Sequence, residues 1–227
     1  MPEIIEFIGK IVEDSHPMVD IILPVYKHLE LTEKCLKSLE ENENNYHVIV
    51  IDNSADNVGV VKAENLGIKQ SKNDYILIVG NDTTFSPNFL SNMFVPMKED
   101  ERVKVVGSLF EHSTNYQTPS HFGEFLKGKK WILVPMGDSV NFSCTLIDKK
   151  MFDKFGLLDE NFFLGFGADD DFCRRVFRGG HRLAINMQNI IYHEGRVTLK
   201  EIPNWEDIAK KEKEYYFKKW NIQRLAR

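Results

Sequence analysis

Short apolar runs alternate in this chain with segments of helical spacing. The runs at 19–24, 47–51, 75–79 and 103–107 contain few charged residues, as expected of strands that are buried on both faces. Because such strands pair mainly in parallel when they alternate with helices, the pattern predicts an α/β fold with a Rossmann-like, mainly parallel central sheet and helices on both faces. Ligands bind such sheets beyond the carboxyl ends of the strands, so we expect function there.

Apolar residues three and four positions apart, together with capping residues, mark the helices between these runs. Further strands are expected at 141–147 and 190–193, and residues 111–130 are expected to form a surface loop. The predicted helices cover 3–13, 32–41, 56–71, a segment starting at Ser86-Pro87, 149–155, 170–178 and 204–220.

The N-terminal segment 1–17 is expected to contain an amphipathic helix. Ile4, Ile8 and Ile11 share one face of this helix, and the other face is mainly acidic. An acidic face disfavours binding to an anionic membrane. We therefore expect the helix to dock on the domain or on a second subunit of a homo-oligomer.

Composition excludes several classes of function. The 227 residues fit one domain, and the net charge of -5 gives no reason to expect nucleic acid binding. The three cysteines, Cys35, Cys144 and Cys173, are not spaced as metal ligands, so the sequence predicts neither a disulfide framework nor a zinc site and favours the reducing cytoplasm. The apolar runs are too short to cross a bilayer, and no transmembrane segment or signal peptide is expected.

Two acidic segments carry the chemistry that the residues suggest. Asp82 follows a buried strand, where a carboxylate can hold a metal-bound phosphate. Asp169, Asp170 and Asp171 open a predicted helix, and a carboxylate there can remove a proton from a substrate. The plainer alternatives are that Asp82 is a turn residue and that the three aspartates cap the helix, although one would suffice for a cap. Together the two segments favour metal-assisted group transfer.

A series of short motifs runs along the chain in a fixed order. It consists of Pro24-Val25-Tyr26, Asp52-Asn53-Ser54, Asn65-Leu66-Gly67, Gly80-Asn81-Asp82, Asp169-Asp170 and His193. From Val19 to Gly195 this order resembles that of the family 2 glycosyltransferases, which have the GT-A fold. In that family the last three motifs are a DXD-type metal motif, an acidic base motif and a late histidine.

The resemblance implies a role for each of these residues. Asp82 and His193 would bind the cofactor, Mn²⁺ or Mg²⁺, while Asp169 would be the general base and Asp170 would bind the acceptor. The nucleotide-sugar would be bound by Pro24, Val25, Tyr26, Asp52, Asn65, Gly67 and Asn81.

The resemblance also implies the reaction. We expect an inverting, metal-dependent enzyme of hexosyltransferase type, which moves a sugar from a nucleotide-sugar, expected to be a UDP-sugar, to the hydroxyl group of a glycan, lipid-linked or protein acceptor. Within the single domain 1–227, residues 19–110 would form the nucleotide-binding half, 131–195 the acceptor and catalytic half, and 204–220 a C-terminal helix.

Two alternatives stay open. Gly80 stands where the family often has Asp or Asn, and Ala168 replaces a usual Glu, which favours a catalytically weakened nucleotide-sugar-binding protein of the same fold. A sugar-phosphate nucleotidyltransferase shares much of the architecture. It would need a Gly-rich loop with basic residues after the first strand, where this chain has Pro24-Val25-Tyr26-Lys27.

Overall fold

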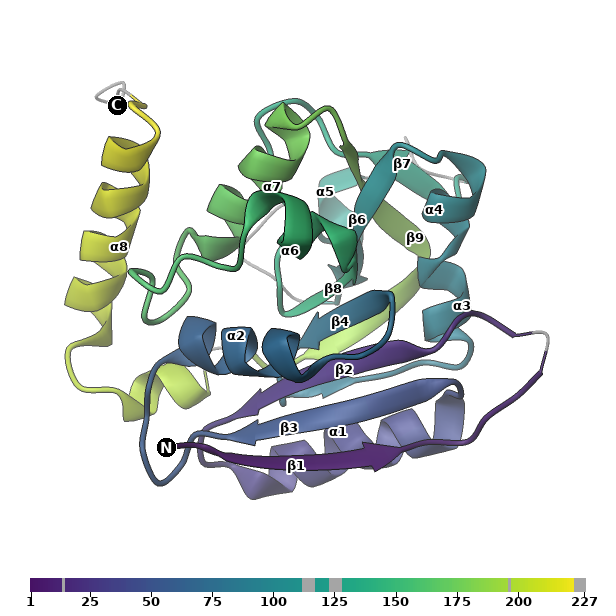
Figure 1. The fold of residues 1–227 in the computed structure, drawn as a ribbon, viewed down its shortest axis with the longest axis horizontal. Coiled ribbons are helices and arrows are strands. Elements are labelled where there is room, and N and C mark those ends of the chain that lie inside the picture. Colours follow the sequence, from purple (N-terminus) through teal and green to yellow (C-terminus); the bar gives the residue numbers. More distant parts are fainter. Residues whose placement is uncertain (14, 112–116, 123–127, 196, 223–227) are drawn as a thin grey trace.

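The computed structural model describes residues 1–13, 15–111, 117–122, 128–195 and 197–222. These residues form one nine-stranded sheet with helices on both faces (Figure 1). The strands are β1 (Glu3–Ile8), β2 (Val19–Val25), β3 (Tyr46–Asp52), β4 (Tyr75–Val79), β5 (Thr83–Thr84), β6 (Val103–Phe110), β7 (Trp131–Leu133), β8 (Cys144–Asp148) and β9 (Arg182–His193). The helices are α1 (Leu29–Asn42), α2 (Val60–Gln70), α3 (Phe89–Met93), α4 (Val95–Glu99), α5 (Pro119–Phe122), α6 (Lys150–Phe155), α7 (Ala168–Arg178) and α8 (Trp205–Lys219), with a 3-10 turn at Thr198–Glu201.

The order of strands in the sheet is β1-β3-β2-β4-β8-β6-β9-β5, and β7 pairs with β9. The predicted α/β sheet with helices on both faces is confirmed, and β3, β2 and β4 are parallel as expected. The sheet is nevertheless mixed, because β1, β5 and β7 pair antiparallel with their neighbours and β8, within the sheet, runs antiparallel to both β4 and β6. An apolar run does not encode the direction of the strand beside it, so the sequence pattern missed this reversal.

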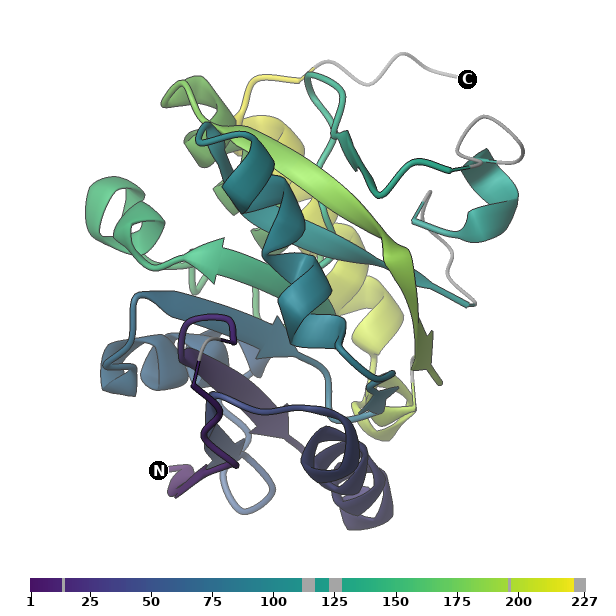
Figure 2. The same cartoon turned by 90° about the vertical axis from the view of Figure 1, so that its right-hand side faces the viewer.

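Each face of the sheet carries its own apolar core. Alternate residues of β2 point to opposite faces, so Ile21 joins the cluster under α1, α3 and α4, whereas Ile22 joins the cluster under α2, α6, α7 and α8. Phe89 and Phe172 are fully buried examples from the two clusters. In Figure 2, α3 and α4 lie on the near side of the sheet and α8 lies on the far side. Burial on both faces explains why the strands read as continuous apolar runs.

The prediction of an N-terminal helix is wrong. Glu3–Ile8 is strand β1, which pairs antiparallel with β3 in a register that sets Ile4 opposite Ile51. The repeat of isoleucines fits a helix and a strand equally well in so short a segment, and the unpaired edge of β3 decides between them. Ile4 packs on the sheet core, whereas Ile8 is 65% exposed. The segment does dock on the domain, but as a strand.

The remaining elements lie close to their predicted positions. The helix expected from Ser86-Pro87 begins at Phe89, and the last strand is longer than expected. The expected loop 111–130 contains the short helix α5, and its residues 112–116 and 123–127 lie outside the described part of the chain. In the part that the structure describes, no helix combines the length and the apolar character that a membrane crossing requires.

Strand register brings the functional candidates to one edge of the sheet. Val25 at the end of β2 lies opposite Asp52 at the end of β3, and Gly80 follows directly after β4. The antiparallel pairing of β5 with β9 sets Thr83 opposite His193, so the late histidine reaches the same edge from the second half of the chain.

Candidate active site

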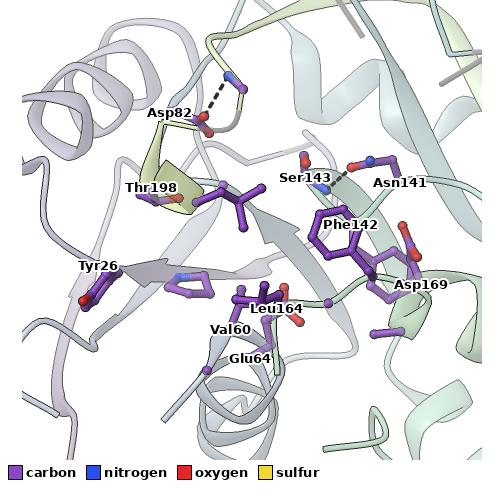
Figure 3. A pocket seen from close by; sticks show the side chains of 18 of the residues that line it. Tyr26, Val60, Glu64, Asp82, Asn141, Phe142, Ser143, Leu164, Asp169 and Thr198 are labelled. Carbon is purple, nitrogen blue, oxygen red and sulfur yellow. Dashed lines mark hydrogen bonds between the residues drawn. The ribbon is translucent and has the colours of Figure 1, made fainter. Parts of the chain in front are cut away.

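A cleft of about 1030 Å³ opens at the carboxyl ends of β2, β3 and β4. Tyr26 and Asp82 line it from the first half of the chain, and Asp169 lines it from the second (Figure 3). Asn53 and His193 line it as well. The position agrees with the edge at which ligands bind open α/β sheets. The cleft thus brings together the residues predicted to bind metal and the residue predicted to be the base.

Asp82 and His193 form a pair in this cleft. His193 Nε2 lies 3.1 Å from Asp82 Oδ1, and the backbone N–H of Gly195 donates a 3.0 Å hydrogen bond to Asp82 Oδ2. Burial acts to raise the pKa of Asp82, but the hydrogen bond and the charge of His193, together with the Gly195 N–H, outweigh it and hold the pKa below its usual value. Asp82 is therefore an ionised carboxylate at neutral pH.

The donor set of this pair suits a hard or borderline divalent cation. Mn²⁺ accepts both carboxylate and imidazole ligands, and such ions commonly take further ligands from substrate phosphates and water. Across the described ranges, His, Cys, Asp and Glu side chains do not gather in groups of three or more that could hold a metal. Asp82 and His193 fit a site of this open kind, in which the substrate completes the ligand set.

The structure gives a reason for the glycine at position 80, where the DXD pattern has an acidic residue. A Cβ atom added at Gly80 would lie 2.9 Å from Asp82 Oδ1, closer than real Cβ contacts. The Gly80 N–H donates a 2.9 Å hydrogen bond to the carbonyl of Ser143, which fixes the backbone at this point. Glycine leaves the space in which the Asp82 carboxylate meets His193.

Asp169 lies in the first turn of α7, after Gly167, whose φ of 109° no other residue adopts easily. Its Oδ1 accepts a 2.8 Å hydrogen bond from the Asp170 N–H. Burial, and then the negative charge of Asp170, raise the pKa of Asp169 well above its ordinary value, although backbone hydrogen bonds act in the opposite direction. Such a carboxyl is a stronger base than an ordinary aspartate once it has lost its proton.

The three successive aspartates have different partners. Asp170 accepts a hydrogen bond from the Ser139 hydroxyl group and lines the cleft. Asp171 is fully buried and faces away from the cleft, where it pairs with Arg175 at 3.0 Å and Lys219 at 2.7 Å. Asp171 has a structural role in joining α7 to α8, and only the first two aspartates are available to a substrate.

The structure brings some of the predicted nucleotide-sugar residues to the cleft and leaves others outside it. Pro24, Val25, Tyr26 and Asn81 line the cleft. Asp52 lies beside it at the end of β3, where its carboxylate accepts a 2.9 Å hydrogen bond from the Ser54 N–H.

Asn65 and Gly67 are not part of the cleft lining, because both hold α2 in place. The Asn65 side chain donates a 2.9 Å hydrogen bond to the Leu158 carbonyl and accepts a 3.0 Å hydrogen bond from the Leu158 N–H. A Cβ atom at Gly67 would come within 2.5 Å of the Ile22 side chain, so only glycine allows this helix to approach β2 so closely.

Sequence reasoning missed two carboxyl groups on helices. Glu64 on α2 lines the cleft and is 7% exposed. Glu212 on α8 accepts hydrogen bonds from the backbone N–H groups of Leu164 and Phe166, at 2.7 and 2.9 Å. Each lies in the apolar stripe of its helix, Glu64 between Val61 and Ile68, and Glu212 between Ala209 and Tyr216. A charged residue in such a stripe is the signal that could have identified them.

Comparisons of sequence relate this chain to glycosyltransferases. Residues 53–154 match the family described as Glycosyl transferase family 2. The dTDP-rhamnosyl transferase RfbF of Shigella flexneri is 25% identical over 171 residues, which cover 62% of this chain and 57% of the relative. The uncharacterized glycosyltransferase RT0329 of Rickettsia typhi is 27% identical over 175 residues, which cover 64% of this chain and 54% of the relative. The chain thus spans little more than half the length of these two relatives.

Solved structures share the fold. The mannosyltransferase PcManGT from Pyrobaculum calidifontis, solved in complex with GDP-Man and Mn²⁺, superposes with a TM-score of 0.65 at 16% identity, over 94% of this chain and 68% of that one. GalNAc-T7, solved with UDP, GalNAc and Mn²⁺, gives a TM-score of 0.61 at 12% identity, over 91% of this chain and 50% of that one.

These neighbours are GT-A glycosyltransferases, so the fold is the predicted GT-A fold. Within this class, the sequence comparisons point to one family, because its model matches residues 53–154 and the two relatives are named as glycosyltransferases. The chain thus resembles glycosyltransferase family 2, as the order of its motifs indicated.

Proposed function

We propose that this protein is an inverting, metal-dependent glycosyltransferase that moves a hexose from a nucleotide-sugar, a UDP-sugar by our expectation, to an acceptor hydroxyl group. The observation that carries the proposal is the presence of two kinds of group in one cleft. The Asp82–His193 pair suits a metal-bound diphosphate, and Asp169 suits proton removal from an acceptor. Neighbours of the same fold were solved with Mn²⁺ and with GDP-Man or UDP, which supports a donor of this class.

The proposed chemistry assigns one task to each part of the cleft. Asp82 and His193 would hold Mn²⁺ or Mg²⁺, which supplies positive charge to offset the diphosphate. The acceptor oxygen forms a bond to the anomeric carbon while the bond from that carbon to the diphosphate oxygen breaks. The acceptor proton passes to Asp169, and the electron pair leaves with the nucleoside diphosphate. Attack opposite the leaving group inverts the anomeric configuration.

The two ends of the cleft receive the two substrates in this proposal. The nucleotide lies beside Tyr26 and Asn53, at the ends of β2 and β3, and the acceptor approaches from the side of Asp169 and Asp170. Acceptors of the glycan, lipid-linked and protein classes all present a hydroxyl group to such a base. A weakened, binding-only protein is the second candidate, and Gly80 counts less in its favour now that its packing against Asp82 supplies a reason for glycine.

The test is donor turnover with Mn²⁺. Purified protein is incubated with UDP-N-acetylgalactosamine, GDP-mannose or dTDP-rhamnose, and release of the nucleoside diphosphate is followed with and without EDTA. We expect slow, EDTA-sensitive hydrolysis of one donor, which stops in Asp82→Ala. Once an acceptor is found, NMR of the product should show the anomeric configuration opposite to that of the donor. Binding without any turnover would favour the binding-only candidate, and a product with retained configuration would reject the inverting mechanism.

A further inference from the structure

Glu64 is a buried carboxyl group that lines the cleft. It is 7% exposed, and it has no hydrogen bond or ion pair with any residue that the structure describes. The other buried carboxyl groups of the described chain all have one. Asp20 pairs with His47, Glu43 with the Phe89 N–H, Asp148 with Lys104, Asp171 with Arg175 and Glu212 with the Leu164 N–H.

The position of Glu64 is fixed by contacts on both sides of it. At the start of α2, the Val60 N–H donates a 2.9 Å hydrogen bond to the Phe163 carbonyl, and Gly59, with a φ of 88°, allows the backbone to come this close to Phe163. Directly after Glu64, the Asn65 side chain is bound to Leu158. The carboxyl group therefore cannot leave the cleft by a shift of the helix.

The Glu64 side chain is largely buried but borders the cleft, so groups that enter the cleft, such as water or a ligand, must complete its hydrogen bonds. Glu64 and Asp169 come from different helices and border the same cavity, and in the view of Figure 3 Glu64 lies between Tyr26 and Asp169. In the proposed function the nucleotide lies at Tyr26 and the acceptor at Asp169. The transferred sugar is bonded to the nucleotide and is attacked by the acceptor. It therefore lies between Tyr26 and Asp169 in this proposal, on the stretch of the cleft that Glu64 lines.

The protonation of Glu64 selects the kind of group that it can bind. Burial, and then the negative charge of Asp169 when that residue is ionised, raise the pKa of Glu64 to about 8, which favours its neutral acid form at pH 7. A neutral carboxylic acid donates one hydrogen bond and accepts others, whereas a carboxylate only accepts. This combination matches a sugar hydroxyl group, which also donates and accepts.

We propose that Glu64 is a specificity-determining residue that hydrogen-bonds hydroxyl groups of the transferred sugar and so orients that sugar beside Asp169. The inference rests on the proposed function, because it places the sugar between the nucleotide and the base. It also predicts that a side chain with one donor and one acceptor can replace Glu64. Gln is such a side chain and Ala is not.

The experiment measures, by calorimetry with Mn²⁺, the affinities of wild type, Glu64→Gln and Glu64→Ala for a nucleotide-sugar and for its nucleoside diphosphate alone. Three pairs are tried with wild type: UDP-N-acetylgalactosamine with UDP, GDP-mannose with GDP, and dTDP-rhamnose with dTDP. The pair whose nucleotide-sugar binds wild type most tightly is then used for all three proteins. We expect Glu64→Ala to lower the affinity for the intact nucleotide-sugar by about tenfold or more, and Glu64→Gln to lower it by less than about threefold. Affinity for the nucleoside diphosphate should stay the same in all three proteins.

Controls separate a role in binding from a role in folding. Lys62→Gln changes an exposed residue of the same helix and should leave both affinities unchanged. Glu64→Gln should melt no lower than wild type, because it removes an unpartnered acid, whereas a structural role requires a lower melting temperature.

Four results would overturn the inference. Unchanged donor affinity in Glu64→Ala would show that Glu64 does not contact the sugar. Equal loss of affinity for the donor and for the nucleoside diphosphate would show that Glu64 acts on the nucleotide or on the fold. If Glu64→Gln loses as much donor affinity as Glu64→Ala, Glu64 binds the donor as an ionised carboxylate. A cationic amino sugar would require that form. If wild type binds no donor at all, the proposed function fails as well.

Discussion

Glu212 on α8 accepts a 2.7 Å hydrogen bond from the backbone N–H of Leu164, in the loop that leads to the candidate base Asp169. A second hydrogen bond, 2.9 Å long, comes from the Phe166 N–H. Glu212 is buried, and the loop contributes Leu164, Gly165 and Phe166 to the cleft. The C-terminal helix, which has no place in the sequence motifs of the site, thus fixes one wall of it.

Glu212→Ala should therefore damage both the fold and the site. Two backbone N–H groups lose a buried acceptor, for which we expect about 2–3 kcal/mol of lost stability. Glu212→Gln keeps one acceptor oxygen and should cost about half as much. Urea unfolding followed by fluorescence measures both values. Glu214→Gln changes an exposed residue of the same helix and should leave stability unchanged. Equal stability of Glu212→Ala and wild type would show that α8 does not hold this loop.

Asp82→Ala should remove the metal-dependent part of nucleotide binding. A ligand that binds only the native state stabilises it by mass action, by about 2.7 kcal/mol at a hundredfold excess over Kd. Wild type should therefore melt higher with Mn²⁺ and UDP together than with UDP and EDTA, and Asp82→Ala should lose most of this difference. Asp138→Asn, which changes an exposed carboxylate outside the cleft, is the control. Equal shifts in wild type and Asp82→Ala would reject Asp82 as a metal ligand.

The sequence could predict the parts of this protein that local pattern determines. The runs that became β2, β3 and β4 are mostly apolar because both faces are covered, and their order alone placed Tyr26 and Asp82 at one edge. His193 could be placed only by the resemblance, since its approach depends on the pairing of β9 with β5. The direction of β8 and the strand structure of β1 depend on which neighbouring edge is free, and a local pattern does not record that.

The roles of α2 also depend on packing that no local pattern contains. The Asn65-Leu66-Gly67 motif was predicted to bind the nucleotide-sugar, but Asn65 is bound to Leu158 and Gly67 faces Ile22. The neighbouring Glu64 has the side chain that faces the cleft. The motif thus lies on a helix that borders the cleft, while the geometry of the helix decides which of its residues faces the cleft.

The N-terminal strand should be required for stability. The strand pairs with β3, and Asn45 holds the segment that follows it. The Asn45 side chain accepts a 2.7 Å hydrogen bond from the Val12 N–H and donates 2.9 Å hydrogen bonds to the carbonyls of Val12 and His16. A truncated protein that starts at Met18 loses these bonds and uncovers the edge of β3. We expect a melting temperature lower by several degrees and concentration-dependent aggregation, since exposed strand edges pair with other chains. Light scattering and calorimetry of the truncated and full chains decide the matter, and unchanged melting and size would show the strand to be dispensable.

The last prediction concerns the pH dependence of transfer. Asp169 can accept a proton only when it is ionised, and burial, followed by the charge of Asp170, raises its pKa above the ordinary 3.8. Transfer should therefore fall as pH decreases through this raised pKa, well above the pH at which an exposed aspartate would take up its proton. Asp170→Asn removes the negative neighbour, so the pKa of Asp169 should drop and the acidic limb of kcat/KM should move to lower pH, even though acceptor use weakens.

The stability of the fold should depend on pH in the opposite direction to the transfer rate. A carboxyl group whose pKa is raised in the folded state binds its proton more tightly there than in the unfolded chain, so it destabilises the fold as pH rises through that window. Asp169→Asn removes this effect. The variant should be at least as stable as wild type at pH 8, with little difference at pH 4, while transfer falls by about 10²–10⁴-fold. Urea unfolding at the two pH values and the kcat/KM profile test both signs. An unshifted acidic limb in Asp170→Asn, or wild-type transfer in Asp169→Asn, would show that another group is the base.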